Sequence, residues 1–279
     1  MDQRPGESVD RGNLTRLLEK VRDDCGLDLA QYRPRYLERR IAVRLQALGL
    51  VTYRQYESHL DKDPEEYAKL LDALTISVTQ FFRDTSVFDL FRSRIVPDLI
   101  GPESTRHRPV VRAWSAGCAT GEEAYSIAMT LLGGVRDHAA RRPIVQVIGT
   151  DIDEAALETA RRAEYPIAQL EQIPASEQQR YVDVHGDRFR IRPDVTDHVR
   201  FEYLNLFEDR LARVVDVVFC RNVFIYFNRE DQERMLASFW DCLVKGGYLV
   251  LGRSERLAPA LAERFEVVSV RERIYRKPS

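Results

Sequence analysis

The sequence is poor in cysteine. Its 279 residues contain four cysteines, and none of them lies near a second cysteine or a histidine. They are Cys25, Cys118, Cys220 and Cys242. The chain therefore has no CxxC pair and no zinc-ligand spacing, so we expect no metal. Scattered, unpaired cysteines are typical of a reducing compartment, which predicts a cytoplasmic protein.

The sequence also has no long apolar run and carries little net charge. No segment approaches the roughly 18 apolar residues of a membrane-spanning helix. The N-terminal residues MDQRPGESVDRG lack the apolar core of a signal peptide. We expect no membrane insertion. The 42 Lys and Arg residues balance 44 Asp and Glu residues, for a formal charge of −2. This balance argues against a general binder of polyphosphates, so any electrostatic attraction must be local.

The first hundred residues have apolar positions at helical spacing and no strand-like alternation. One apolar helix face ends at Gly49, and Thr52 with Gln55 has the spacing of a capping box. The chain length suits two domains. We therefore expect a small all-helical domain and its linker over residues 1–105.

One of these predicted helices is rich in arginine, with Glu38 as its single acid. The arginines are Arg33, Arg35, Arg39, Arg40 and Arg44. Three interpretations are open. The face is simply solvated, or it docks an acidic protein, since the planar guanidinium suits carboxylates. The third, nucleic acid binding, is disfavoured because no binding motif accompanies the arginines.

After residue 106 the pattern changes to alternating strands and helices. The predicted strands are 110–114, 144–150, 199–203, 214–219 and 248–252, followed by a pair near 265–270 and 273–277. Such alternation predicts an α/β domain over 106–279, with a mostly parallel sheet and an antiparallel C-terminal strand. A segment at about 165–196 interrupts the pattern and contains a predicted antiparallel hairpin around Gly186.

Open α/β sheets bind ligands beyond the carboxyl ends of their strands. The first strand is followed by Glu122 and Glu123 at the start of a helix, and the second by Asp151 and Asp153. Acids at a helix start repel a pyrophosphate, which favours a ligand that lacks phosphate or carries positive charge. Asp151 is placed to accept hydrogen bonds from ribose hydroxyls. The alternatives are that the glutamates only complement the helix dipole and that Asp153 caps the next helix.

From about Leu14 to its end, the chain resembles the chemotaxis receptor methyltransferases of the CheR family. The matching motifs are TQFFRD at 79–84, WSAG at 114–117, TGEEAYSIAM at 120–129, TDID at 150–153, LNL at 204–206 and FCRNVFIYF at 219–227. The resemblance implies a Rossmann-like domain that binds S-adenosylmethionine (AdoMet). It also implies methylation of glutamate side chains on methyl-accepting chemotaxis receptors.

The resemblance implies site residues as well. Arg83 and Tyr226 would hold the reacting groups in line. The cofactor pocket would comprise Ser77, Thr79, Arg83, Glu122, Asp151, Asn205, Leu206, Arg221 and Asn222. Ser77 stands where the family usually has asparagine, which predicts a weakened contact, because serine still donates and accepts one hydrogen bond.

An acidic partner is now implied, because the receptor's cytoplasmic helical bundle presents glutamates. We therefore favour docking for the arginine-rich face. The predicted contacts are Arg33, Arg39, Arg40 and Arg44. We expect a monomer that binds no nucleic acid. The predicted hairpin lacks the longer glycine-rich loop with which some family members grip a receptor's C-terminal pentapeptide, so we expect no such tether.

Two alternative functions remain open. One is a catalytically silent scaffold that binds AdoMet, and the other is a nucleotide-dependent oxidoreductase. The latter is disfavoured because the loop after the first strand lacks the GxGxxG pattern.

Overall fold

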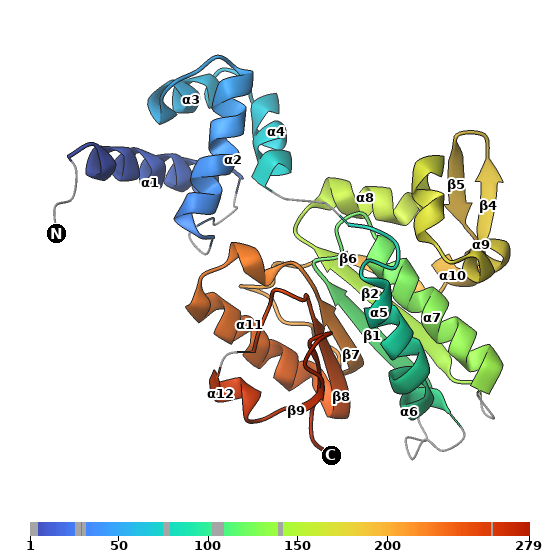
Figure 1. The fold of residues 1–279 in the computed structure, drawn as a ribbon. Coiled ribbons are helices and arrows are strands. Elements are labelled where there is room, and N and C mark those ends of the chain that lie inside the picture. The colour runs from blue at the N-terminus through green and yellow to red at the C-terminus, as the bar shows by residue number, and fades with distance from the viewer. Residues whose placement is uncertain are drawn as a thin grey trace. The chain divides into compact units, whose positions relative to one another are not determined.

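The computed structural model describes residues 5–25, 29, 32–74, 79–101, 109–138, 142–257 and 259–279. Its internal contacts define two units (Figure 1). The helical unit comprises Met1–Ile76 and Tyr226–Asp231, and the α/β unit comprises Ser77–Ile225 and Gln232–Ser279. Among the described residues, no helix is both long enough and apolar enough to cross a membrane.

The helical unit contains α1 (Pro5–Cys25), α2 (Pro34–Ala47), α3 (Tyr53–Leu60) and α4 (Glu65–Leu74). Its core buries Leu17, Ile41, Tyr56 and Leu70, among others. The predicted capping box is confirmed: the Thr52 side chain accepts from the Gln55 N–H, and the Gln55 side chain accepts from the Thr52 N–H. Local signals therefore predicted these helices well.

A buried ion pair connects α2 to α4. The Arg44 guanidinium donates to both oxygens of the Glu66 carboxylate at 2.8 and 2.9 Å, and the Tyr56 hydroxyl donates to it at 2.9 Å. Glu66 is 0% exposed. Burial alone would raise the pKa of Glu66, but the hydrogen bonds from Arg44 and Tyr56 bring this pKa below its usual value. His59 and Asp63 lie close to Glu66, in a grouping that could hold a metal ion. The Glu66 carboxylate, however, is already occupied by Arg44 and Tyr56.

The α/β unit is built on a seven-stranded sheet in the order β6-β2-β1-β7-β8-β10-β9. The strands are β1 (Val110–Ala116), β2 (Ile144–Asp151), β6 (Val199–Tyr203), β7 (Val215–Cys220), β8 (Leu243–Leu251), β9 (Glu266–Ser269) and β10 (Ile274–Arg276). The first five in spatial order are parallel, and β10 is antiparallel to both of its neighbours. This confirms the predicted fold class.

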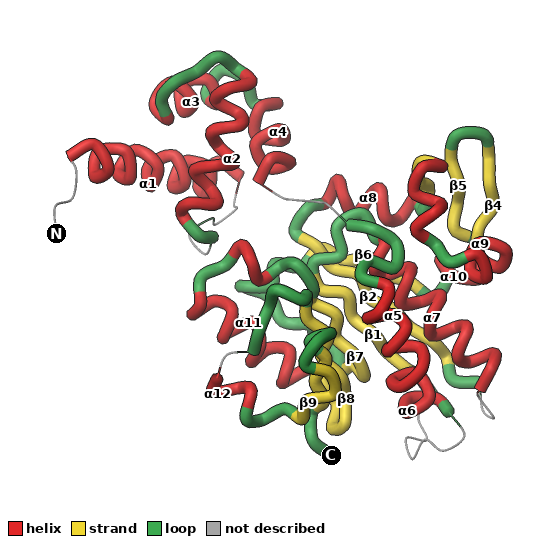
Figure 2. The backbone as a smooth tube through the Cα atoms, in the orientation of Figure 1, coloured by secondary structure: helices red, strands yellow, loops and turns green. Residues whose placement is uncertain are grey.

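Helices cover both faces of this sheet (Figure 2). They are α5 (Thr85–Leu90), a π-helical turn (Phe91–Ile95), α6 (Val96–Ile100), α7 (Glu122–His138), α8 (Glu154–Arg162), α11 (Arg229–Cys242) and the short α12 (Pro259–Ala262). The segment α5–α6 shares a buried core with α7 and the sheet. On the opposite face, Phe239 of α11 packs edge-on against Trp114 of β1 at 5.2 Å.

The two units divide at an earlier position in the chain than the predicted domain boundary. The helices α5 and α6 fall in the α/β unit, and the division lies between Ile76 and Ser77 instead of near residue 105. The reason is packing, because the Phe91 ring lies 5.1 Å from Phe219 of β7. Helical periodicity in this segment did not reveal which core its apolar face would join.

The insertion is larger than the predicted hairpin. Its sheet has the order β3-β5-β4, in which β4 (Val182–His185) and β5 (Arg188–Ile191) form the expected hairpin and β3 (Glu164–Pro166) adds a third strand. Gly186 has φ +62° in the turn. The insertion also includes a 3₁₀ helix (Ile167–Gln172), α9 (Ala175–Tyr181) and α10 (Pro193–Thr196).

Candidate functional site

The site predicted from the sequence lies at the carboxyl edge of the parallel sheet. The chain runs from β1 outward through β2 to β6, and then returns to β7 on the other side of β1. The strand order therefore reverses between β1 and β7, which is where open α/β sheets bind their ligands. The loops that follow β1, β2, β6 and β7 all start at this edge.

The loop after β1 lies close to its neighbours. Gly117 adopts φ +78°, and a Cβ atom there would lie 2.6 Å from the Val223 side chain. The N–H groups of Gly117 and Cys118 both donate to the Thr150 carbonyl, at 2.8 and 2.9 Å. Glycine is therefore required by both the backbone conformation and the close approach of the loop after β7.

Two predicted cofactor residues, Glu122 and Asp151, are carboxylates in a desolvated setting. Asp151 accepts from the N–H groups of Ala119 and Asp153 at 2.8 and 3.0 Å. Glu122 is 2% exposed and accepts from the Thr120 hydroxyl at 2.7 Å. Burial raises the pKa of both carboxyls above their usual values. These partners are neutral, so a cationic ligand would stabilise the ionised forms.

Glu123 has different surroundings from its neighbour Glu122. Its carboxylate accepts from the Ser115 hydroxyl at 2.7 Å and from the Arg221 guanidinium at 3.2 Å. A second guanidinium nitrogen of Arg221 donates to Asp84. The Arg221 side chain is 1% exposed. Two carboxylates thus surround a residue that the sequence assigned to the cofactor, and Arg221 connects the starts of α5 and α7 to the end of β7.

The sequence did not single out Asp84. An aspartate before a helix usually caps it, but Asp84 forms no side-chain cap on α5 and directs its carboxylate to Arg221. The motif TQFFRD contained this aspartate, yet nothing local indicated its partner, because Arg221 is far away in the sequence.

The segment that contains Thr79 and Arg83 is held in place by buried side chains and by a hydrogen bond to α7. Phe81 and Phe82 are buried, and the Phe82 N–H donates to the Ser126 hydroxyl at 2.9 Å. Phe82 and Asp84 adopt φ +50° and +56°, a left-handed conformation that is costly for residues other than glycine. Arg83 lies between them, so its backbone is tightly constrained. Ser77 lies outside the described residues.

Asn205 and Leu206 follow β6 as predicted. The Asn205 side-chain oxygen accepts from the Phe207 N–H at 3.1 Å, and its own N–H donates to the Asp209 carboxylate at 2.9 Å. The Asn205 oxygen therefore shapes the turn. Leu204 is tied to the β2 loop, because its N–H donates to the Asp151 carbonyl at 3.1 Å.

Asn222 shows an unfilled hydrogen-bonding capacity. It follows β7 and has φ +62°, and its buried side-chain oxygen Oδ1 has no hydrogen-bond partner among the described residues. A buried acceptor without a donor is costly. The Oδ1 atom is therefore suited to accept from a bound ligand.

Tyr226 belongs to the helical unit by its contacts. Its ring lies 4.8 Å from that of Tyr36, and its carbonyl accepts from the Arg33 N–H at 2.9 Å. The Arg33 side chain donates to the Phe227 carbonyl at 2.9 Å. Arg33, predicted to dock a receptor, thus holds the backbone around Tyr226 in place.

The other docking candidates differ in exposure. Arg39 is exposed, as is Arg35 of the same helix, which was not among the predicted contacts, whereas Arg40 is half-buried with its guanidinium carbon 5.8 Å from the centre of the Tyr36 ring. Arg44 is engaged by buried Glu66. The exposed pair therefore forms the part of the arginine-rich face best placed to meet a partner.

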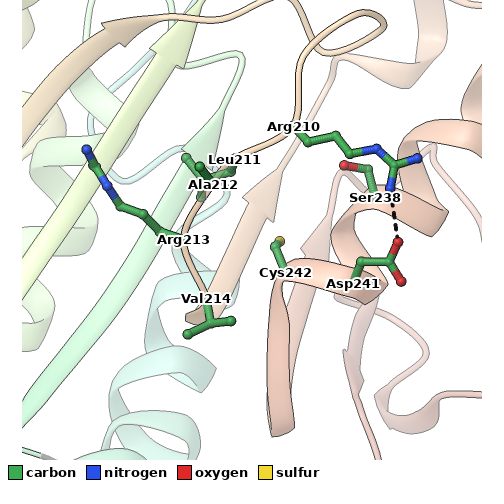
Figure 3. A pocket seen from close by; sticks show the side chains of 8 residues that line it. All are labelled: Arg210, Leu211, Ala212, Arg213, Val214, Ser238, Asp241 and Cys242. Atoms are coloured by element: carbon green, nitrogen blue, oxygen red, sulfur yellow. Dashed lines mark hydrogen bonds and ion pairs between the residues drawn. The ribbon is translucent and has the colours of Figure 1, made fainter.

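A separate pocket lies at the opposite edge of the sheet (Figure 3). It has a volume of about 180 Å³ and lies beside the start of β7 and the end of α11; Arg210 and Arg213 line it. Both arginines are paired, Arg210 with Asp241 at 3.3 Å and Arg213 with Glu202 at 2.9 Å. None of the residues that line this pocket belongs to the predicted site at the carboxyl edge.

Comparison with known proteins gives consistent matches. Residues 77–274 match the family description "CheR methyltransferase, SAM binding domain", and residues 13–75 match "CheR methyltransferase, all-alpha domain". The chain is 34% identical to chemotaxis protein methyltransferase 2 of Pseudomonas aeruginosa, over 90% of this chain and 88% of that protein. It is 31% identical to the chemotaxis protein methyltransferase of Listeria innocua, over 85% and 87%. The Borreliella burgdorferi protein of that name is 29% identical over 90% of both chains.

Proposed function

Because this chain belongs to the CheR methyltransferase family and uses AdoMet as its cofactor, we propose that it methylates glutamate side chains of chemotaxis receptors. The products are glutamate methyl esters and S-adenosylhomocysteine. The observation that carries this proposal is a pair of carboxylates with raised pKa values, the buried Glu122 and the half-buried Asp151, beside the loops of a matched AdoMet-binding domain.

The described residues fit AdoMet chemically. The cofactor has no phosphate, and it supplies a methyl group activated by a sulfonium cation. Its charge suits Glu122 and Asp151, whose hydrogen-bond donors are neutral. Its donors suit the Asn222 side-chain oxygen, to which no described residue donates. Thr79, Asn205 and Leu206 complete the proposed set. Arg221 would support the site indirectly, because its guanidinium donates hydrogen bonds to Glu123 and Asp84 and so connects the segments around the pocket.

The chemistry asks little of a general base. A glutamate side chain exposed to water has a pKa of about 4.3 and is ionised near neutral pH, so it is already a nucleophile. The protein contributes orientation, which accounts for up to roughly 7–11 kcal/mol in well-aligned intramolecular reactions. We assign this task to Arg83 and Tyr226. Arg83 has the charge to orient a carboxylate, and its backbone is constrained on both sides.

The proposed substrate is the cytoplasmic helical bundle of a chemoreceptor. We propose that it binds to α2 through the exposed Arg35 and Arg39. Complementary charge would favour encounter with its glutamates. We propose a cytoplasmic monomer that does not require a receptor pentapeptide.

The test is transfer of a labelled methyl group from AdoMet to purified receptor cytoplasmic domains. The proposal predicts label that is released by mild base, as expected of a methyl ester. Base-stable label would contradict a carboxylate acceptor, and AdoMet binding without transfer would favour the silent scaffold. Arg83→Ala should lower transfer about 100-fold, while Arg94→Ala, an exposed arginine of the same unit, serves as the control.

A further inference from the structure

Glu255 is a buried carboxylate whose described hydrogen bonds are all to backbone groups. It is 3% exposed and follows β8. Its oxygens accept from the N–H groups of Gly252 at 2.6 Å, Asn222 at 3.1 Å and Phe224 at 2.8 Å. One side chain thus holds the loop after β8 and the loop after β7 together.

The Glu255 carboxylate is closely surrounded by the backbone of both loops. A Cβ atom at Gly252 would lie 2.6 Å from the Glu255 carboxylate and 2.8 Å from the Asn222 nitrogen. The Glu255 N–H also donates back to the Gly252 carbonyl at 2.9 Å. The loop after β8 is therefore folded tightly around the carboxylate, which leaves little freedom for its position.

The carboxylate acts at the point where the backbone is unusual. Asn222 has φ +62°, and no residue in the described part of the chain donates a hydrogen bond to its buried side-chain oxygen. Such an arrangement persists only when its surroundings enforce it. Glu255 supplies that constraint by binding the N–H groups of Asn222 itself and of Phe224.

We infer that Glu255 is a positioning residue for AdoMet, acting through the backbone of Asn222 to present the Asn222 side chain to the cofactor. This inference rests on the proposed function, in which Asn222 contacts AdoMet. Glu255 need not touch the cofactor itself. Its role is to keep a costly loop conformation in place before the cofactor arrives, so that binding does not have to create it.

The test is a double-mutant cycle on AdoMet binding. Glu255→Gln keeps the side-chain volume, but its NH₂ group faces a backbone N–H, so at least one hydrogen bond is lost. We expect calorimetry to show an AdoMet dissociation constant raised about 10-fold. In an Asn222→Ala background the same change should raise it less than about 2-fold, because the group being positioned is gone. Glu263→Gln, which changes an exposed glutamate of the same unit, is the control.

Catalysis provides a second readout. With AdoMet at saturation, kcat of Glu255→Gln should stay within about 2-fold of wild type while the KM for AdoMet rises. An equal rise of the dissociation constant in both backgrounds, or no rise in the wild-type background, would overturn the positioning role. If Glu255→Gln does not fold, as judged by thermal unfolding, Glu255→Asp takes its place in both backgrounds. A wild-type protein that binds no AdoMet would instead refute the proposed function.

Discussion

Glu66 of the helical unit has different partners from Glu122 and Asp151 of the α/β unit. In the helical unit, Glu66 is neutralised by Arg44 and hydrogen-bonded by Tyr56, and its pKa is lowered. In the α/β unit, Glu122 and Asp151 are held by neutral groups, and burial raises their pKa. The first arrangement is complete within the protein. The second leaves charge to be balanced by something else.

The difference distinguishes carboxylates that hold the fold from those suited to a ligand. A buried group with a raised pKa, positioned at a strand edge where ligands bind, is a candidate for function. Glu122 and Glu123 show the same contrast within one helix turn, because only Glu123 is paired with an arginine. Residue type and position alone would rank these two glutamates equally.

The largest effect is expected from breaking the pair in the helical unit. Arg44→Ala leaves the Glu66 carboxylate buried without its cation, which should cost about 3 kcal/mol of local stability. Hydrogen exchange of amides in α2 and α4 measures this loss. Arg39→Ala, which removes an exposed arginine of the same helix, should cost less than about 0.5 kcal/mol. Equal protection in both variants would contradict a structural role for Arg44.

Glu122→Gln tests whether a carboxylate of the α/β unit serves cofactor binding and not stability. It removes a charge that has no cationic partner within the described ranges of the chain, so the free energy of unfolding should not fall. AdoMet affinity should fall about 10-fold or more, because a charge-assisted contact is lost. Calorimetry and denaturant unfolding of the same sample separate the two quantities. Glu171→Gln, at an exposed position, is the control, and a destabilised Glu122→Gln with normal affinity would reverse the assignment.

The two units should also respond differently to pH. A cationic ligand prefers ionised Glu122 and Asp151, whose pKa values are raised in the free protein. AdoMet affinity should therefore be full above these raised values and decline as pH falls through them, by up to about tenfold per unit for each group. The lowered pKa of Glu66 means that its contribution to stability persists over this range and is lost only at lower pH. A flat binding profile would contradict this coupling.

The smallest effect concerns the surface of the helical unit. Arg35→Ala with Arg39→Ala should raise the KM for the receptor about 2- to 5-fold at low salt, since exposed charges contribute little each. The difference should shrink as salt is added, and AdoMet affinity should not change. Arg54→Ala on α3 serves as the control. A parallel loss of cofactor affinity would refute docking at this surface.

Much of the fold was accessible from the sequence because its signals are local. Apolar periodicity placed the helices, as with Leu37 and Ile41 of α2, and apolar runs placed the parallel strands. The third strand of the insertion, β3, was missed because three residues are too short to show alternation. The domain boundary was displaced because α5 and α6 look helical in either domain.

The sequence by itself determined which residue types stand at the strand ends, because chain order and strand direction bring those ends to one edge. Only the tertiary structure decided the partner of each charge. Arg221 meets Glu123 across a separation of 98 residues and Asp84 across 137, and Glu255 reaches Asn222 across 33. Burial and pairing set the energy of a charge, and both depend on segments that come together only when the chain folds.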